Sequence, residues 1–371
     1  MRVLIIFNHP APYKVSVFNE LAKYVDLTVL FERDKASDRP DSFYANNHYD
    51  FNHIIFKKGY IGAEGSTSNE VKNYLKRHHN EYDAILMNGY SHLAEIKAIK
   101  YLAKHKIKFG LLINGGVIRN KEFFLKKAYK KSLIRKASYY LSPSQESNKY
   151  LIYYGADESR IYNYFYSNYS KIEISFASSE EKLELRKKYS LPLDKKIFIN
   201  PSQFIERKNN LFLMSLFKDR DDVLLLVGEG KLQQKYEEYI KHNQLKNVIL
   251  MPFVKKEVLF ELYKTSDCHI TLSKEDIFGH TILESFSNGI PVISSKAVIS
   301  SLEYVKDGFN GYLVDISNKE EIVNAMNNVN ASFNKNALDS AYQTTFENSA
   351  LSIYEILKRE YEKANLFYKR C

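Results

Sequence analysis

The sequence of 371 residues has no run of about 18 apolar residues, the length that a helix needs to cross a bilayer. We therefore expect a chain that does not span a membrane. It has only two cysteines, Cys268 and Cys371, which lie far apart and belong to no Cys/His cluster. This spacing predicts neither a disulfide nor a metal site. The apolar start, residues 1–7, is short and lacks a small-residue cleavage site, so we expect a cytoplasmic location.

The excess of positive charge belongs to the first half of the chain. Residues 1–170 hold 26 Lys and Arg against 16 Asp and Glu, whereas residues 171–371 hold 28 of each. Much of the excess lies in Lys121–Lys136, where basic and apolar residues alternate as in an amphipathic helix. We expect this helix to lie on an anionic membrane surface, which would make the protein peripheral on the inner face of the plasma membrane. A solvated helix face is the alternative, and no nucleic-acid-binding motif is present, so no nucleic-acid partner is expected.

Short apolar, β-branched runs alternate with helical stretches along the whole chain, as parallel sheets with crossover helices require. The runs predict strands at, among others, Arg2–Phe7, Lys108–Asn114 and Val223–Val227, and one of the helical stretches is Lys256–Thr265. The fold class is therefore α/β, with two Rossmann-like, doubly wound domains. We place the first at residues 1–170 and the second at 171–350, with a C-terminal helix, 351–371, packing back toward the first. Ligands bind beyond the carboxyl ends of the strands in such sheets, so the site is expected in a cleft between the domains.

The most informative segment runs from Ser273 to Glu284 and reads as a strand end, a glycine turn and a helix start. The first amides of a helix bind anions well, and the helix dipole favours negative charge there. Gly279 would let a ligand approach the backbone closely. Asp276 precedes the helix and Glu284 lies within it, so the two carboxylates can face one ligand, one at a sugar and the other at a ribose.

Two further loops follow predicted strands. The loop from Gln203 to Lys208 brings Arg207 and Lys208 to a strand end, where cations suit a diphosphate. Gly228 begins a Gly-x-Gly turn, which by itself is a weak indication of a ligand site. Each of these loops alone is as easily an ordinary solvent-facing turn.

Taken in order, these segments resemble the family 4 glycosyltransferases (glycosyl transferases group 1), which have the two-domain GT-B fold. The likeness runs through Gln203…Arg207-Lys208, Val227-Gly228-Glu229-Gly230, Asp276–Glu284, Gly289-Ile290-Pro291-Val292-Ile293 and Glu303…Asp307-Gly308-Phe309-Asn310-Gly311. It implies transfer of a sugar from a nucleotide-sugar donor, with retention and without a metal or other cofactor. The catalytic residues would be Asp276, Lys208 and Arg207. Donor-binding residues would be Gln203, Gly228, Phe253, Glu275, Phe278, Gly279, His280, Thr281 and Glu284.

The sequence departs from the family pattern at two positions. Asp276 stands where the family usually has glutamate, with Glu275 beside it as a rival, and Gln203 stands where arginine is frequent. A non-catalytic subunit that binds nucleotide or glycan therefore remains an alternative, as does an inverting or epimerising enzyme on the same fold.

The acceptor is expected to be a saccharide or lipid-linked molecule of cell-surface polysaccharide synthesis (capsule, O-antigen or exopolysaccharide), because the first domain is basic and rich in aromatic residues. The residues expected on the acceptor side fall at strand ends of that domain, where turn and capping roles are also common. They are His9, Tyr13, Gly115, Gly116 and Arg119.

Overall fold

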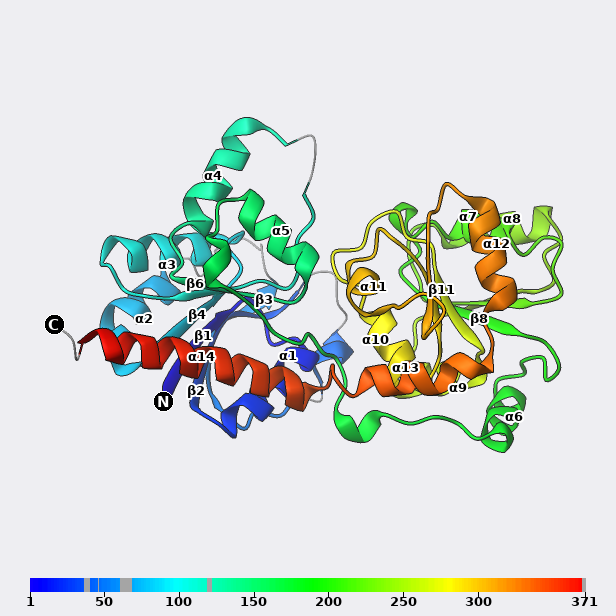
Figure 1. Cartoon of the computed structure of the whole chain (residues 1–371), viewed down its shortest axis with the longest axis horizontal. Coiled ribbons are helices and arrows are strands. Elements are labelled where there is room, and N and C mark those ends of the chain that lie inside the picture. The colour runs from blue at the N-terminus through cyan, green and yellow to red at the C-terminus, as the bar shows by residue number, and fades with distance from the viewer. Residues whose placement is uncertain (37–40, 46, 61–68, 119–121, 369–371) are drawn as a thin grey trace. The chain divides into compact units, whose positions relative to one another are not determined.

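The computed structural model describes residues 1–36, 41–45, 47–60, 69–118 and 122–368 (Figure 1). The chain divides into two compact units, each an α/β domain. Unit 1 comprises Met1–Asn168 with Thr345–Cys371, and unit 2 comprises Tyr169–Thr344. The sequence placed these boundaries at residues 170 and 350.

Unit 1 is built on a parallel sheet of seven strands in the order β3-β2-β1-β4-β5-β6-β7. The strands are β1 (Arg2–Phe7), β2 (Asp26–Lys35), β3 (Asn52–Tyr60), β4 (Ala84–Asn88), β5 (Gly110–Leu112), β6 (Tyr139–Ser142) and β7 (Ile161–Asn163). The helices are α1 (Pro12–Ala22), α2 (Glu70–His78), α3 (Leu93–Lys104), α4 (Phe124–Ile134), α5 (Gln145–Tyr153) and α14 (Phe346–Tyr368).

Unit 2 repeats the plan with six parallel strands in the order β10-β9-β8-β11-β12-β13. They are β8 (Ile197–Pro201), β9 (Val223–Val227), β10 (Val248–Met251), β11 (Cys268–Thr271), β12 (Val292–Ser295) and β13 (Gly311–Val314). The helices are α6 (Ser179–Lys188), α7 (Asn210–Ser215), α8 (Gln233–His242), α9 (Lys256–Thr265), α10 (His280–Ser287), α11 (Ile299–Tyr304), α12 (Lys319–Asn328) and α13 (Asn334–Ala341).

The strands of unit 2 are apolar on both sides because helices cover both faces of the sheet. Phe198 and Leu224 belong to the core on one face, whereas Ile199 and Leu225 belong to the core on the other. Side chains alternate between faces along a strand, so successive residues of β8 and β9 fill two separate cores. The predicted fold class, two Rossmann-like domains, is therefore confirmed.

The order of the strands determines where a ligand can bind in each unit. The order reverses between β1 and β4 in unit 1 and between β8 and β11 in unit 2. The carboxyl ends of two strands at such a switch point send their loops in opposite directions, which leaves room for a ligand. In unit 2 these loops are residues 202–209 and 272–279, the two segments that the sequence indicated.

Several short elements differ from the expectation. β5 is limited to Gly110–Leu112, although the apolar run predicted a strand over Lys108–Asn114. β13 was not predicted, because Gly311 opens it and only four residues follow the turn. In both cases pairing with neighbouring strands, which the sequence does not display, determines the length.

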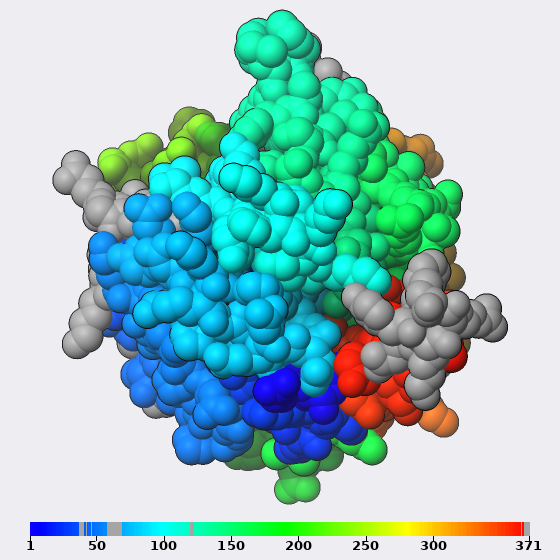
Figure 2. Space-filling view, turned by 90° about the vertical axis from the view of Figure 1, so that its left-hand side faces the viewer, coloured from blue at the N-terminus to red at the C-terminus, as the bar shows by residue number. Residues whose placement is uncertain are grey.

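The basic segment predicted as a helix over Lys121–Lys136 forms α4, which begins at Phe124 and ends at Ile134. Lys121 lies outside the described residues. Within α4 only Leu133 and Ile134 are buried. The beginning of α4 therefore stands away from the body of unit 1, as the teal projection at the top of Figure 2 shows.

The long C-terminal helix α14 packs against α1 within unit 1. Tyr354 of α14 stacks on Tyr24, just after α1, with ring centroids 5.1 Å apart. Near the other end of α14, Glu360 accepts a hydrogen bond of 2.6 Å from the hydroxyl of Tyr162 in β7. The end of the chain thus contributes to the core and the edge of the first domain.

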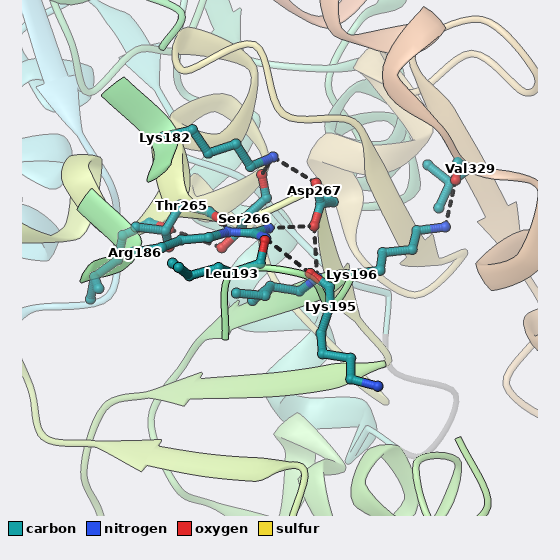
Figure 3. A network of polar contacts seen from close by, with 11 residues as sticks. Lys182, Arg186, Leu193, Lys195, Lys196, Thr265, Ser266, Asp267 and Val329 are labelled. Carbon is teal, nitrogen blue, oxygen red and sulfur yellow. Dashed lines mark hydrogen bonds and ion pairs between the residues drawn. The ribbon is translucent and has the colours of Figure 1, made fainter. Parts of the chain in front are cut away.

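A polar network holds α6 to the amino-terminal edge of the sheet in unit 2 (Figure 3). Asp267 accepts hydrogen bonds from Arg186 (2.8 Å), Lys182 (2.6 Å) and the backbone amide of Ile197 (2.7 Å). The guanidinium of Arg186 also donates to the carbonyl oxygens of Thr265, Leu193 and Lys195. A nearly buried arginine with this many acceptors is a structural anchor, because each of its three side-chain nitrogens donates a hydrogen bond.

Candidate functional site

The two loops at the switch point of unit 2 are joined by hydrogen bonds. Asn209, which follows a 3-10 turn over Glu206–Lys208, adopts a left-handed conformation with φ of 59°. Its side-chain amide donates to the carbonyl oxygen of Leu272 at 3.1 Å, at the end of β11. The backbone amide of Lys274 donates to the carbonyl oxygen of Arg207 at 2.8 Å. The loop after β8 and the loop after β11 therefore form one continuous surface.

The three residues predicted to be catalytic meet on this surface. The Nζ of Lys208 lies 2.5 Å from Oδ2 of Asp276, and Nη1 of Arg207 lies 3.8 Å from the same oxygen. The Lys208 side chain is 12% exposed and that of Asp276 16%, so this pair is largely removed from water. An ammonium has three donors, which leaves Lys208 able to bind a second anion while it holds Asp276.

Asp276 is the acid that faces the cations, whereas its neighbour Glu275 contributes a carbonyl oxygen to Arg207 at 3.3 Å. The backbone of Asp276 is fixed by a short bridge to the segment after β12. Its amide donates to Ala297 at 3.0 Å, and its carbonyl accepts from Ile299 at 3.3 Å. Segment 297–300 was missed in the sequence, because no residue in it carries chemistry of its own.

The start of α10 has the features of an anion site. Gly279 precedes the helix with φ of +90°, and no side chain caps the helix at this end. The carbonyl oxygen of Gly279 accepts from the hydroxyl of Ser300 at 2.8 Å, and that of Phe278 accepts from the Ser300 amide at 2.8 Å. The turn is thus fixed from behind, and the first amides and the dipole of the helix can serve an anion.

The remaining predicted donor-binding residues are distributed around this surface. Phe278 is buried, and its ring meets that of His280 edge to face at 5.8 Å. Thr281 is half-buried, Gln203 is exposed, and Phe253 is an exposed aromatic ring in the loop after β10. Only Phe253 among these offers a large apolar face to solvent.

Packing explains why residue 228 is a glycine, and the sequence alone could not show this. Its φ is +148°, and a Cβ placed there would lie 2.1 Å from the carbonyl oxygen of Ser202. Gly230 is similarly close to the backbone of Phe204. The two glycines therefore let the loops after β8 and β9 pack backbone to backbone, which requires the absence of a side chain.

Behind the surface lies His269, a fully buried residue of β11 that sequence reasoning did not single out. Neither ring nitrogen has a hydrogen-bond partner among the residues that the structure describes. Burial, and then the positive charge of Lys208, lowers the pKa of His269 to about 3. The imidazole is therefore neutral, and the positive charge of the site stays on Lys208 and Arg207.

Glu284 lies half-buried on α10, beyond the first turn. Its surroundings include the buried phenol of Tyr263, whose pKa is held well above its usual range by burial and then by the Glu284 charge. Sequence reasoning missed Tyr263, since an apolar helix position gave no reason to single it out.

The described acceptor-side candidates lie in unit 1: His9 is in the loop after β1, Tyr13 is in the first turn of α1, and Gly115 and Gly116 are in the loop after β5. Nδ1 of His9 is 3.1 Å from the hydroxyl of Tyr44, and the ring of Tyr13 lies 6.2 Å from that of Tyr166. Gly115 has φ of +135°, and a Cβ on Gly116 would overlap the ring of Tyr150. Arg119 lies outside the described residues. All of these assignments stay predictions.

Lys14, in the first turn of α1, is a buried cation that the sequence did not reveal. Its Nζ lies 4.0 Å from the ring centroid of Tyr166 and within 6 Å of the rings of Tyr13 and Tyr164. Burial lowers the pKa of Lys14 to about 7. The aromatic faces partly replace the water that the ammonium has lost.

Two features bear on metals and membranes. Among the described residues, no three His, Cys, Asp or Glu side chains gather as a metal site needs. The acidic run Asp219-Arg220-Asp221-Asp222 precedes β9, at the sheet edge opposite the site, where Asp221 pairs with Lys195 and Asp222 pairs with Arg220. None of the described helices is long and apolar enough to span a bilayer.

Comparison with known proteins finds a family resemblance in the second unit. Residues 181–337 match the family model described as glycosyl transferases group 1. The match covers most of unit 2 and less than half of the whole chain. The placement of the chain among the retaining family 4 enzymes stays a prediction.

Curated relatives match over part of their length. An uncharacterised glycosyltransferase of Methanocaldococcus jannaschii is 28% identical over 130 residues, which cover 34% of this chain and 36% of the relative. The N-acetyl-α-D-glucosaminyl L-malate synthase of Bacillus anthracis is 24% identical over 184 residues, 47% of this chain and 48% of that protein. The matched part thus spans half or less of these relatives.

Solved structures match over nearly the whole chain. Anabaena HepE, solved in complex with UDP, has a TM-score of 0.78 at 18% identity and covers 97% of this chain and 100% of its own. The same protein was also solved with UDP-glucose. WaaG, a glycosyltransferase involved in lipopolysaccharide biosynthesis, has a TM-score of 0.67 at 13% identity, with 96% and 99% covered. At these identities the likeness establishes the GT-B fold.

Proposed function

We propose that this protein is a glycosyltransferase that transfers a sugar from a nucleoside-diphosphate sugar to a saccharide or lipid-linked acceptor, with retention at the anomeric carbon. One observation carries the proposal: Nζ of Lys208 lies 2.5 Å from Oδ2 of Asp276. The two residues belong to the two hydrogen-bonded loops, one of which leads into the start of α10, where the N-cap residue is a glycine. The match of unit 2 to the group 1 family model, and the UDP bound by HepE, support a nucleotide-sugar donor.

The cations and the helix start would hold the leaving diphosphate. Lys208 supplies a point charge, Arg207 a planar fork, and α10 its first amides, so positive charge is available without a metal ion. As the bond to the sugar breaks, negative charge grows on the diphosphate, and fixed donors stabilise that state more than the ground state. The acceptor hydroxyl would attack on the face from which the diphosphate leaves, which gives retention.

The carboxylates would orient the donor. Asp276 can accept from a sugar hydroxyl while Lys208 holds its carboxylate in place, and Glu284 can accept from the ribose diol. A ribose that donates to a half-buried carboxylate gains a charge-assisted hydrogen bond, which is stronger than a neutral one.

The test is transfer or hydrolysis of a panel of nucleotide sugars by the purified protein in the presence of a chelator. We expect turnover with at least one donor, an α-linked product from an α-linked donor, and loss of turnover in Glu284→Ala. Glu237→Ala, an exposed acid on α8, is the matched control and should keep full activity. A strict requirement for added metal, or full activity in folded Glu284→Ala, would refute the assignment. Nucleotide binding without turnover on any donor would instead favour a binding subunit.

We also propose that the acceptor lies at a membrane surface, as in cell-surface polysaccharide synthesis, and that α4 contacts that surface. Phe123, Phe124 and Leu125 at its beginning are 65%, 68% and 57% exposed, an unusual run of large apolar side chains in water. Lys127 and Lys130 lie over the rings of Tyr153 and Tyr154. These contacts draw two of the lysines toward the domain, so apolar insertion would carry much of the binding.

Sedimentation with lipid vesicles tests this attachment. The wild-type protein should sediment more with vesicles rich in phosphatidylglycerol than with phosphatidylcholine vesicles, and Phe124→Ser should reduce both. Phe309→Ser, which removes an exposed ring from unit 2, should sediment like the wild type. Equal sedimentation with anionic and neutral vesicles would contradict the role of the lysines, and no effect of Phe124→Ser would contradict the role of the apolar residues.

A further inference from the structure

A single buried phenol links α9 to the start of α10. Tyr263 is fully buried, and its hydroxyl donates to the carbonyl oxygen of Thr281 at 3.0 Å. Thr281 is in the first turn of α10, beside the glycine that opens the helix. The phenol therefore gives the turn that carries the proposed diphosphate amides a second fixed contact, besides that of Ser300.

The charge of Glu284 lies close enough to the same hydroxyl to contribute, after burial, to a pKa of Tyr263 well above its usual range. The phenol is thus near both a backbone carbonyl of the first turn and the carboxylate proposed to bind the ribose. A partly exposed glutamate has several accessible rotamers, and losing that freedom on ligand binding costs affinity. A neighbouring hydroxyl that can donate to the carboxylate reduces this cost, because it limits the freedom of the side chain before the ligand arrives.

The phenol ring itself has little freedom to move. His269 of β11 lies against it edge to face, with centroids 5.9 Å apart, and both rings are buried. His269 in turn lies close enough to Lys208 for the positive charge of Lys208 to contribute, after burial, to its lowered pKa. The ring of Tyr263 is therefore supported by the strand that leads into the loop carrying Asp276.

We propose that Tyr263 is a positioning residue for the donor: through its hydroxyl it holds Glu284 and the first turn of α10 in the arrangement that receives ribose and diphosphate. This inference rests on the proposed function and deepens it, because it assigns a role in donor affinity to a residue that never touches the donor. The hydroxyl of Tyr263 is the group that would act on donor affinity, whereas its ring packs in the core.

Isothermal titration with UDP tests the inference on the full chain. Tyr263→Phe keeps the ring and removes only the hydroxyl. We expect UDP to bind about 5- to 30-fold more weakly, the range for one lost buried hydrogen bond. With a donor that the enzyme uses, KM should rise by a similar factor, while kcat should change less.

The matched control is Tyr140→Phe. Tyr140 is a buried tyrosine of unit 1 whose hydroxyl donates to the carbonyl oxygen of Ile134 at 3.0 Å, the same kind of hydrogen bond. Both variants should lose similar thermal stability, but only Tyr263→Phe should lose UDP affinity. Equal loss of stability with unchanged UDP affinity in Tyr263→Phe would overturn the inference.

A double-mutant cycle shows whether Tyr263 acts through Glu284. If it does, Tyr263→Phe should weaken UDP binding much less in a Glu284→Ala background, where the side chain has no oxygen to accept from the phenol, than in the wild type. Additive effects would overturn that route. A wild-type protein that binds no nucleotide in a panel of nucleoside diphosphates would refute the proposed function itself, which is a different result from normal UDP binding by Tyr263→Phe.

Discussion

Substituting Gly279 by alanine would disturb the start of α10 in a way that the structure makes specific. The residue has φ of +90°, where a side chain costs about 1–2 kcal/mol. The added Cβ would lie 2.5 Å from a methyl carbon of Val298 and 3.0 Å from the hydroxyl oxygen of Ser300. To restore an ordinary contact, the turn and Val298 must separate by roughly 1 Å.

Neither neighbour can yield without consequence. Val298 is buried, and the hydroxyl of Ser300 is the donor that fixes the Gly279 carbonyl. The first turn of α10 is therefore expected to shift outward by several tenths of an ångström or more. Hydrogen bonds to phosphate weaken steeply over such distances, and the loss of one to a charged group is about 1.5–3 kcal/mol. UDP should then bind between about tenfold and 150-fold more weakly.

Gly308→Ala separates this effect from backbone strain. Gly308 also has positive φ, +69°, but a Cβ there would meet no atom within 4 Å. Isothermal titration with UDP and thermal unfolding of both variants should show a stability loss in each, and weaker UDP binding in Gly279→Ala alone. If Gly279→Ala binds UDP as tightly as the wild type while it loses more stability than Gly308→Ala, the start of α10 does not hold the diphosphate.

Three further outcomes are expected. Lys208→Met should lower kcat by a factor of about 10²–10³, the usual effect of removing one hydrogen-bond donor that stabilises transition-state charge. Initial rates at a saturating concentration of the nucleotide sugar measure this change. Arg186→Met should lower the free energy of unfolding, measured in urea, by about 2–3 kcal/mol. This loss is smaller than for a fully buried ion pair because the Asp267 side chain is 30% exposed. The UDP affinity should stay unchanged because this network lies at the opposite edge of the sheet. Lys14 has a folded-state pKa of about 7, whereas the usual pKa of a lysine side chain in water is 10.5, so between these values the unfolded chain binds the extra proton. Wild-type stability should therefore rise with pH from 7 to 10, by up to about 1.4 kcal/mol per pH unit, and Lys14→Met should abolish this rise; an equal rise in both proteins would contradict the assignment.

Much of the fold could be predicted because local patterns and tertiary demands agree. Arg2–Phe7, Val223–Val227 and Lys256–Thr265 have the predicted bounds in the structure. Strands buried on both faces show as apolar runs, and an amphipathic helix shows its period. Elements of three or four residues, such as β5 and β13, were misjudged or missed, because pairing with a neighbouring strand decides their existence and a single sequence contains no record of that pairing.

The residues of the candidate site also differ in whether the sequence alone could reveal them. Arg207, Lys208 and Asp276 could be found from the sequence, since charged residues and glycines after predicted strands meet at one sheet edge. Tyr263 and His269 could not, because a tyrosine on a helix and a histidine in an apolar strand are typical core residues. Their position behind the loops appears only when α9 and β11 are packed together.

The sequence by itself determined two α/β domains, the location of a basic segment and the presence of a glycine turn that leads into a helix, because each follows from residue order along one or two elements. The tertiary structure decided which acid faces Lys208 and why Gly228 and Gly279 must lack a side chain. It also brought the hydroxyl of Tyr263 to the carbonyl oxygen of Thr281. These contacts depend on distances of 2–4 Å between residues separated by 18 to 68 positions, and only the folded backbone fixes such distances.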